Sequence, residues 1–152
     1  MKLFEESNFA GAKNEFQKSI LENPTSDAYF NLGSAFYAQG NYEDAIDNWK
    51  KSIKLSPRAD AHVNIGCALA INLKKPVDAI PHYEDAIKLS PADGEIYHNY
   101  GVILDHCGKL EEAIIQYSNA VSFSIEPAEA KLRNARARWA CAKALQEDKE
   151  KE

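Results

Sequence analysis

Apolar and small residues recur along most of the chain at spacings of three, four and seven, which is the period of an α-helix buried along one face. The clearest example is DAIDNWKKSIKLSP, residues 44–57, which returns as DAIPHYEDAIKLSP at residues 78–91. Each block spans about 12–14 residues, a length that is marginal for an isolated helix in water. The pattern therefore predicts short helices that are stable only when they pack against one another.

Two kinds of block alternate in phase. The second kind has an alanine, an aromatic residue four positions later and a small residue seven positions later, as in Ala45-Trp49-Ser52, Ala79-Tyr83-Ala86 and Ala113-Tyr117-Ala120, with Ala12, Phe16 and Ser19 as a fourth instance. The first kind has a large residue, a glycine and a second large residue, as in Leu32-Gly33-x2-Phe36, Ile65-Gly66-x2-Leu69 and Tyr100-Gly101-x2-Leu104. Internal repetition at about 34 residues is typical of solenoid proteins.

Turn residues separate the blocks. QGN, NLKKP and CGK stand between the first and second block of a repeat, and NP, SP and SP follow the second block. Proline disfavours a helical residue before it, so each repeat reads as helix, turn, helix and stop. The repeat that contains NLKKP has one extra residue before its second helix. We expect Pro76 in the first turn of that helix and Pro81 in or just after that turn, where a kink is avoided.

Three glycines lie in the middle of predicted helices, where each costs roughly 1 kcal/mol relative to alanine. Their shared phase indicates a packing purpose, because a glycine allows a paired helix to approach closely. We expect Ala45, Ala79 and Ala113 to fill the matching place on the second helices, and the aromatic residues to wedge between neighbouring repeats. These positions are predicted to be core rather than catalytic residues.

The pattern resembles the tetratricopeptide repeat family over nearly the whole chain. The resemblance implies an all-α fold, an α-solenoid that winds as a right-handed superhelix of helix-turn-helix repeats. We expect one array over residues 1–147, with a half repeat at 1–25 and full repeats at 26–58, 59–93 and 94–128. Residues 1–6 can supply only the end of a first helix. We interpret this as a sign that the chain is a piece excised from a longer protein, rather than that its first helix is vestigial.

A capping helix is expected at 128–146, followed by a charged tail at 147–152. Its apolar edge would pack on the last repeat and consists of Ala128, Leu132, Ala135, Trp139 and Ala142. Arg136 stands where each repeat has its glycine. The flanking basic residues are Lys131, Arg133, Arg136, Arg138 and Lys143; they either solvate a cap, as terminal elements of solenoids require, or form a basic docking surface for another subunit.

Charge and cysteine content narrow the class of protein. Net charge is −5, with −7 over residues 1–126 and +2 over 127–152, so an acidic body argues against nucleic-acid binding. No apolar run is long enough for a membrane span, and the first residues lack the apolar core of a signal peptide. Three cysteines without CxxC spacing favour free thiols in a reducing compartment, the cytoplasm or the nucleus.

The resemblance implies that exposed residues of the first helices line a concave groove that binds an extended peptide or a partner's helix. An asparagine stands two residues before each glycine: Asn31, Asn64 and Asn99. A carboxamide has donors and an acceptor and can grip a peptide backbone irrespective of its side chains, as asparagines do in some family members, including the repeats of O-GlcNAc transferase. Bonding within the array is the alternative reading of these asparagines.

A subset of the family grips chaperone C-terminal tails with Lys or Arg three residues before or one residue after the glycine. Here those places hold non-basic residues, so we do not expect chaperone tails to bind through that clamp. The groove edges are acidic, which favours an apolar or mildly basic partner segment. The candidate partner-binding residues, besides the asparagines, are Asp27, Phe30, Ser34, Tyr37, Asp60, Val63, Cys67, Glu95, His98, Val102 and Asp105.

Enzymatic chemistry is not expected. The four histidines, His62, His82, His98 and His106, show no metal-ligand spacing, although Cys107 stands beside the last of them. His98 and Asp105 are seven residues apart and share a helix face, but no nucleophile stands beside that pair, and no phosphate-binding loop or cofactor motif is present. We therefore predict a non-catalytic scaffold that binds a peptide or partner protein without a cofactor or metal. Alternatives are a regulatory or targeting segment of a larger enzyme or complex, and self-association through the ends of the array.

Overall fold

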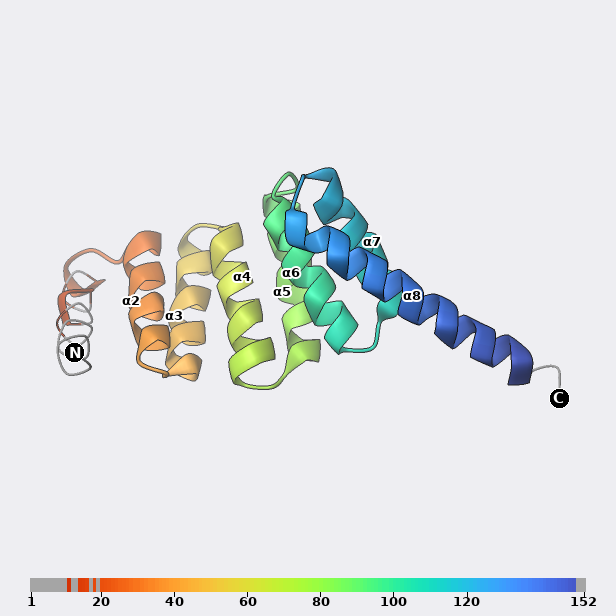
Figure 1. Cartoon of the computed structure of the whole chain (residues 1–152). Coiled ribbons are helices and arrows are strands. Elements are labelled where there is room, and N and C mark those ends of the chain that lie inside the picture. The colour runs from red at the N-terminus through yellow and green to blue at the C-terminus, as the bar shows by residue number, and fades with distance from the viewer. Residues whose placement is uncertain (1–10, 12–13, 17, 19, 150–152) are drawn as a thin grey trace, which may run out of the picture. The chain divides into compact units, whose positions relative to one another are not determined.

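The computed structural model describes residues 11, 14–16, 18 and 20–149, and throughout this part the regular elements are helices (Figure 1). They fall into two compact units, Met1–Leu89 and Ser90–Glu152. The expected remnant of a first helix at 1–6 and the last part of the expected tail, 150–152, lie outside the described residues.

The first unit contains helices in sequence-adjacent pairs. The described residues between 11 and 22 are helical and precede four elements: α2 (Ser26–Ala38), α3 (Tyr42–Leu55), α4 (Ala59–Cys67) with a π-helical extension (Ala68–Asn72), and α5 (Pro76–Leu89). α2 packs on α3, α3 on α4, and α4 on α5. Each helix is short, so most of its stability comes from this packing.

The second unit contains one pair and one long helix. α6 (Gly94–His106) packs on α7 (Leu110–Ser122), and α7 packs on α8 (Glu126–Lys149). The last helix therefore begins two residues before the start that the sequence predicts and extends three residues past the predicted end.

Helix boundaries follow local chemistry. The Thr25 hydroxyl accepts a hydrogen bond from the Ala28 amide at 3.1 Å and caps α2, and Asp93 caps α6 in the same way through the Glu95 amide. Gly40 and Gly108 adopt left-handed φ values of +80° and +76° in the turns after α2 and α6.

The turn before α5 differs because it carries the extra residue. The Leu73 amide donates to the Ala68 carbonyl five residues earlier, at 3.0 Å, so the end of the first helix widens into a π-helical turn. Such a turn accommodates one more residue than an α-helical turn, which matches the extra residue in the sequence. Pro76 is the first residue of α5 and Pro81 its sixth, just after the first turn, as expected.

Each mid-helix glycine lies under an aromatic ring of the paired helix. A Cβ atom added to Gly33 would stand 2.7 Å from the Trp49 ring, and one added to Gly66 or Gly101 would stand 2.7 Å from the ring of Tyr83 or Tyr117, respectively. The aromatic residues, which are expected from sequence between neighbouring repeats, thus contact the glycine of their own repeat. These contacts set the separation of the paired helices.

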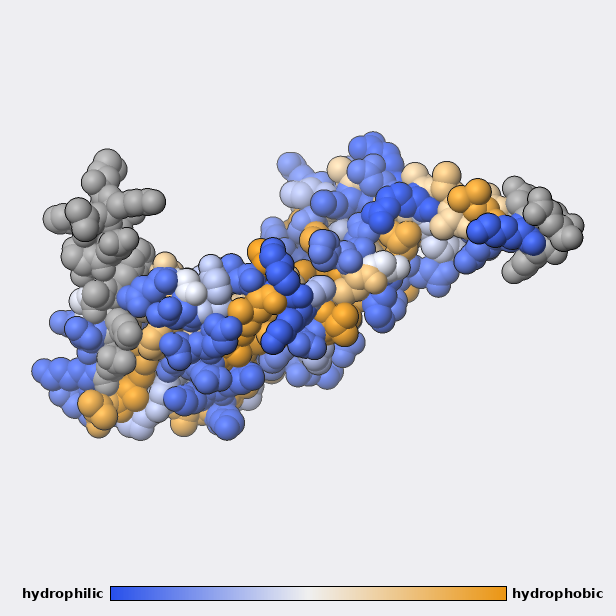
Figure 2. All heavy atoms as spheres, turned by 90° about the horizontal axis from the view of Figure 1, so that it is seen from below, coloured by the Kyte–Doolittle hydropathy of each residue, from blue (hydrophilic) through white to orange (hydrophobic). Residues whose placement is uncertain are grey.

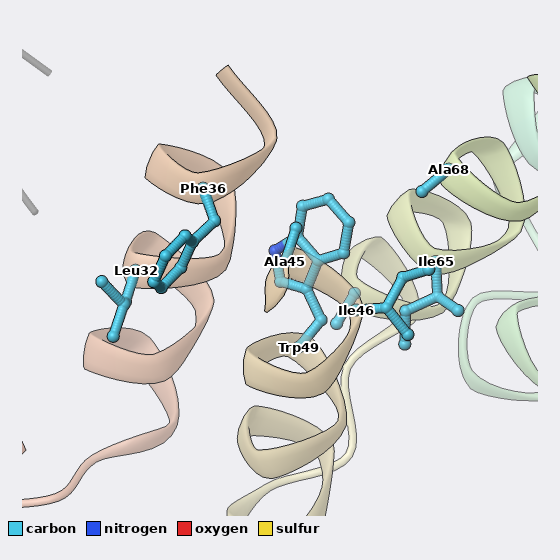
Figure 3. Packing of buried hydrophobic residues seen from close by; sticks show 8 residues of the cluster. Leu32, Phe36, Ala45, Ile46, Trp49, Ile65 and Ala68 are labelled. Carbon is cyan, nitrogen blue, oxygen red and sulfur yellow. The ribbon is translucent and has the colours of Figure 1, made fainter. Parts of the chain in front are cut away.

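The residues predicted to form the core are buried. Ala45, Ala79 and Ala113 have no exposed surface, and Trp49, Tyr83 and Tyr117 have at most 2%. In the first unit the cluster joins α2, α3 and α4 (Figure 3) and consists of Leu32, Phe36, Ala45, Ile46, Trp49, Ala61, Ile65 and Ala68.

The apolar edge of α8 packs only in its first half. Ala128 and Ala135 are buried, Leu132 and Trp139 are half-buried, and Ala142 is exposed, contrary to the expectation that it would pack. α8 has 24 residues and its partner α7 has 13, so the end of α8 extends past the helix on which it packs.

We expect Gly33→Ala to destabilise the chain by about 1–2 kcal/mol, because overpacking against the Trp49 ring and the Ala45 carbonyl outweighs the gain in helix propensity. Urea denaturation followed by circular dichroism measures the change. Gly11→Ala is the matched control, since an added Cβ there has no atom within 4 Å. Equal midpoints for the two variants would contradict the packing role.

Candidate peptide-binding surface

The three asparagines lie on the first helix of each pair, on a different side from the buried glycine. Asn31 of α2 is exposed, and Asn64 of α4 and Asn99 of α6 are half-buried. Within the part of the chain that the structure describes, none of the three carboxamides forms a hydrogen bond; the described polar contacts involve other side chains. The donors and acceptors of these amides are therefore available to a ligand.

Apolar candidates accompany the asparagines. Phe30 and Val63 in the first unit and Val102 in the second are half-buried. The Phe30 ring lies under the Arg58 guanidinium, whose central carbon is 4.0 Å from the ring centroid. This cation–π contact fixes the ring and covers one of its faces.

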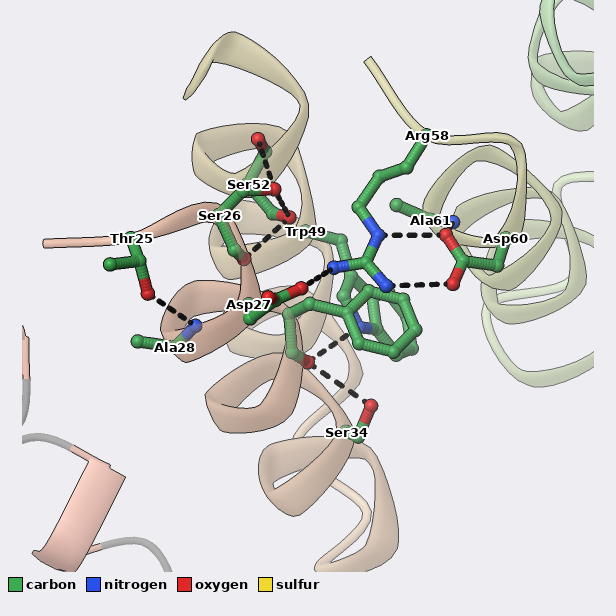
Figure 4. A network of polar contacts seen from close by, with 11 residues as sticks. Thr25, Ser26, Asp27, Ala28, Ser34, Trp49, Ser52, Arg58, Asp60 and Ala61 are labelled. Carbon is green, nitrogen blue, oxygen red and sulfur yellow. Dashed lines mark hydrogen bonds and ion pairs between the residues drawn. The ribbon is translucent and has the colours of Figure 1, made fainter. Parts of the chain in front are cut away.

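Arg58 organises the start of α2 and α4 in the first unit (Figure 4). Its guanidinium donates to Asp27 at 2.7 Å and to both carboxylate oxygens of Asp60 at 2.9 and 2.8 Å. The hydrogen bonds from Arg58 lower the pKa of Asp60, and the same bonds raise the pKa of Arg58. Arg58 was not predicted from sequence to have a role. It stands directly after the Ser-Pro stop that precedes α4.

Other polar candidates already have partners. The Ser34 hydroxyl donates to the Phe30 carbonyl at 3.1 Å, and the Tyr37 hydroxyl donates to the Asn72 carboxamide oxygen at 3.0 Å. The Cys67 sulfur lies 3.1 Å from the Tyr83 hydroxyl, and burial raises the pKa of that hydroxyl. These residues shape the surface but have fewer groups left for a ligand.

In the second unit, Glu95 is exposed and Asp105 is half-buried and paired with Arg138 at 2.7 Å. The His98 ring lies 6.0 Å from the Tyr117 ring, centroid to centroid. Its Nδ1 atom is buried and has no hydrogen-bond partner among the described residues. Burial lowers the pKa of His98, so the ring is neutral at physiological pH.

The acidic groove edge that the sequence suggests is largely neutralised. Asp27 and Asp60 share Arg58, and Asp105 is paired with Arg138, so Glu95 is the candidate carboxylate without an ion pair in the described part of the chain. Arg58 was not predicted from sequence to have a role, and Arg138 was predicted only as part of the basic flank of the last helix. The expected preference for a basic partner therefore has less electrostatic support than the acidic composition suggests.

Two histidines of the first unit face each other across α4 and α5. The Nδ1 atoms of His62 and His82 are 3.3 Å apart, a distance at which one neutral ring donates to the other. Burial is the main cause that lowers the pKa of both rings. The nearby charges are Asp85 and Lys88 on α5 and Lys50 on α3.

Most of the surface seen in Figure 2 is hydrophilic, with separate hydrophobic areas. Leu21, in the first unit, is 86% exposed and lines a hollow of about 460 Å³. The other lining residues are Ile20, Tyr29, Leu32 and Phe36, with the polar Asn48 and Lys51. Self-association through this end of the array stays a prediction.

No helix among the described residues has the length and apolarity to cross a membrane, and all three cysteines are free thiols.

Tetratricopeptide repeat models match residues 26–58, 59–93 and 82–115. The chain belongs to the tetratricopeptide repeat (TPR) family. Its fold is an all-α TPR solenoid, as the sequence pattern predicts. No curated protein matches the chain significantly.

Solved TPR structures are similar to the chain. The first TPR of Spaghetti (RPAP3), bound to the HSP90 peptide SRMEEVD, is 26% identical, with a TM-score of 0.69, and the match covers 76% of this chain and 94% of that one. MamA is also 26% identical, with a TM-score of 0.72 and coverage of 99% and 94%. YrrB, described as a TPR protein with an unusual peptide-binding site, is 21% identical over 91% and 73%, with a TM-score of 0.75.

The histidine environments predict that this TPR chain loses stability in mild acid. His62, His82 and His98 have folded-state pKa values below 6.5, so below that pH the unfolded chain binds more protons than the folded chain. The free energy of unfolding should be flat above about pH 7 and fall as the pH drops from 6.5 towards 5. Urea midpoints across this range measure the effect.

The variant His62→Gln/His82→Gln is the control for this measurement. It should reduce the loss of stability between pH 7 and pH 5 because two of the three half-buried rings no longer titrate. A pH dependence that is absent in the native chain, or unchanged in the variant, would contradict the described histidine environments.

Proposed function

We propose that this chain is a non-catalytic scaffold that binds an extended peptide or a segment of a partner protein at the exposed residues of its first helices, α2 and α4 in the first unit and α6 in the second. The observation that carries the proposal is the set of unpaired carboxamides at one position of the repeat, Asn31, Asn64 and Asn99. The carboxylates Asp27, Asp60 and Glu95 recur at another position of the same helices, but Asp27 and Asp60 are paired with Arg58, whereas all three carboxamides are unpaired among the described residues.

The chemistry of a carboxamide supports binding through the peptide backbone. Each asparagine has two N–H donors and a carbonyl acceptor, which match the carbonyl and amide groups of an extended chain. The similarity to the TPR of Spaghetti, which was solved with a bound peptide, supports peptide binding in general. Backbone recognition tolerates many partner sequences and leaves selection to the neighbouring side chains.

The neighbouring side chains favour an apolar or weakly charged segment. Phe30, Val63 and Val102 offer apolar surface beside the asparagines, and arginine pairing reduces the charge of the nearby carboxylates. For a mildly basic partner, Glu95 is the candidate carboxylate that has no ion pair among the described residues and could pair with a basic side chain. The places that would hold the basic clamp for chaperone tails are occupied by Phe30, Val63, His98, Ser34, Cys67 and Val102.

A peptide selected from a random library against the full chain provides the test. Its affinity should fall by about tenfold or more in Asn31→Ala/Asn64→Ala/Asn99→Ala, because each lost amide removes roughly 0.5–1.5 kcal/mol of hydrogen bonding. Isothermal titration calorimetry measures the affinity. The urea midpoint of the variant should stay near that of the native chain, since these amides bond to nothing within the described residues.

The matched control replaces two asparagines that lie outside the first helices, Asn14→Ala/Asn119→Ala. It should leave the affinity for the selected peptide unchanged. Equal affinity of the native chain and the triple variant would show that the peptide binds elsewhere and would overturn the proposed surface.

A further inference from the structure

The second unit contains a hollow that the repeat signature does not predict. Its volume is about 380 Å³, and it is lined by Val102, Asp105 and His106 of α6, Tyr117 of α7, and Lys131 and Arg138 of α8. Val102 and Asp105 belong to the proposed peptide-binding surface, so the hollow is continuous with that surface. Lys131 and Arg138 are seven residues apart and lie on the same face of α8.

The wall of this hollow is rich in donors and poor in acceptors. Lys131 is exposed and has no ion pair among the described residues, and the Arg138 guanidinium shares the single carboxylate, Asp105. Two cations against one carboxylate leave the lining with a positive charge. A group that enters the hollow therefore meets N–H donors in excess of oxygen acceptors.

Tyr117 adds a buried donor to the same wall. Its side chain has no exposed surface, and its hydroxyl has no hydrogen-bond partner in the described part of the chain. Burial, followed by the charge of Asp105, raises the pKa of Tyr117 to about 12, so the hydroxyl keeps its proton at physiological pH. Buried hydroxyl groups normally have a partner, and an unpaired one in a hollow lined by two cations points to an anionic acceptor.

We propose that this hollow binds a carboxylate of an acidic segment in a protein partner, held by Lys131, Arg138 and the Tyr117 hydroxyl. The inference rests on the proposed function and adds one acidic position, at this hollow, to the otherwise apolar or weakly charged segment proposed there. The side chains of Lys131 and Arg138 are exposed and can reorient around an incoming carboxylate to let it approach the hydroxyl. The hollow has room for an acidic side chain, and its position beside Val102 lets a peptide on α6 place one there.

This anchor differs from the basic clamp discussed above, because two of its three groups come from α8 and the third from α7. It gives Lys131 and Arg138, two of the basic residues that flank the apolar edge of α8, a role in docking. The sequence alone left both solvation of a cap and docking possible for these residues. Arg133, Arg136 and Lys143 lie outside the hollow, so the anchor assigns no role to them.

Titration of the full chain with the blocked hexapeptide Gly-Ser-Glu-Glu-Ser-Gly tests the proposal, with Gly-Ser-Gln-Gln-Ser-Gly as the uncharged control. Backbone amide shifts of Val102, Tyr117 and Lys131 in NMR spectra report binding. The glutamate peptide should shift these amides, and the glutamine peptide should not. The affinity should fall as salt is raised from low to physiological concentration.

Variants separate this site from general attraction to a basic helix. Lys131→Ala should weaken binding of the glutamate peptide about fivefold, the size of one charge-assisted hydrogen bond at a partly exposed site. Arg133→Ala, on the same helix and with the same charge, should leave it unchanged. Tyr117→Phe should weaken binding by about two- to fivefold without lowering the urea midpoint, because the lost hydroxyl has no partner to lose.

Three results would overturn the proposal: equal binding of both peptides, equal effects of Lys131→Ala and Arg133→Ala, or unchanged affinity in Tyr117→Phe. Equally strong amide shifts with inorganic phosphate would identify a general anion site and reject the polypeptide carboxylate. If the library-selected peptide still binds through the asparagines in these cases, the carboxylate anchor alone is wrong.

Discussion

The structure depends on one repeated contact between the two helices of a pair. In this contact, an aromatic ring of the second helix packs on the backbone of a glycine in the first helix. It occurs in all three pairs formed by α2 to α7. Each glycine costs roughly 1 kcal/mol in helix propensity, whereas full burial of a large apolar side chain contributes about 1.5–3 kcal/mol. The burial of the ring therefore offsets the helix-propensity cost of the glycine only when both residues are present. A glycine without the ring, or a ring without the glycine, would destabilise the helix pair.

The same contact determines which residues remain for function. A helix advances by 100° per residue, so the position two residues before the glycine lies about 200° around the helix from it. The ring that covers the glycine thereby directs the asparagine away from the paired helix. Because the glycine and the ring recur at the same positions of each repeat, the asparagine also recurs at one position. The packing of the core thereby determines where the proposed peptide-binding amides lie.

The paired helices, their turns and their buried residues could be predicted from sequence because they depend on spacings within one repeat. The arginine contacts could not, because Arg58 reaches Asp27 and Arg138 reaches Asp105 over separations of 31 and 33 residues. Such pairs depend on how successive helices stack rather than on local periodicity. The π-helical turn before α5 was visible only as an extra residue, and Tyr117 was identified as core without any sign that its hydroxyl lacks a partner.

The central claim concerns the coupling between glycine and ring, and a double-mutant cycle on Gly66 and Tyr83 measures it most directly. In the native background, Gly66→Ala should cost about 1–2 kcal/mol in the free energy of unfolding. In the background Tyr83→Leu, which leaves room above the glycine, the same change should be neutral or stabilise by up to about 1 kcal/mol. An equal cost of Gly66→Ala in both backgrounds would contradict the account.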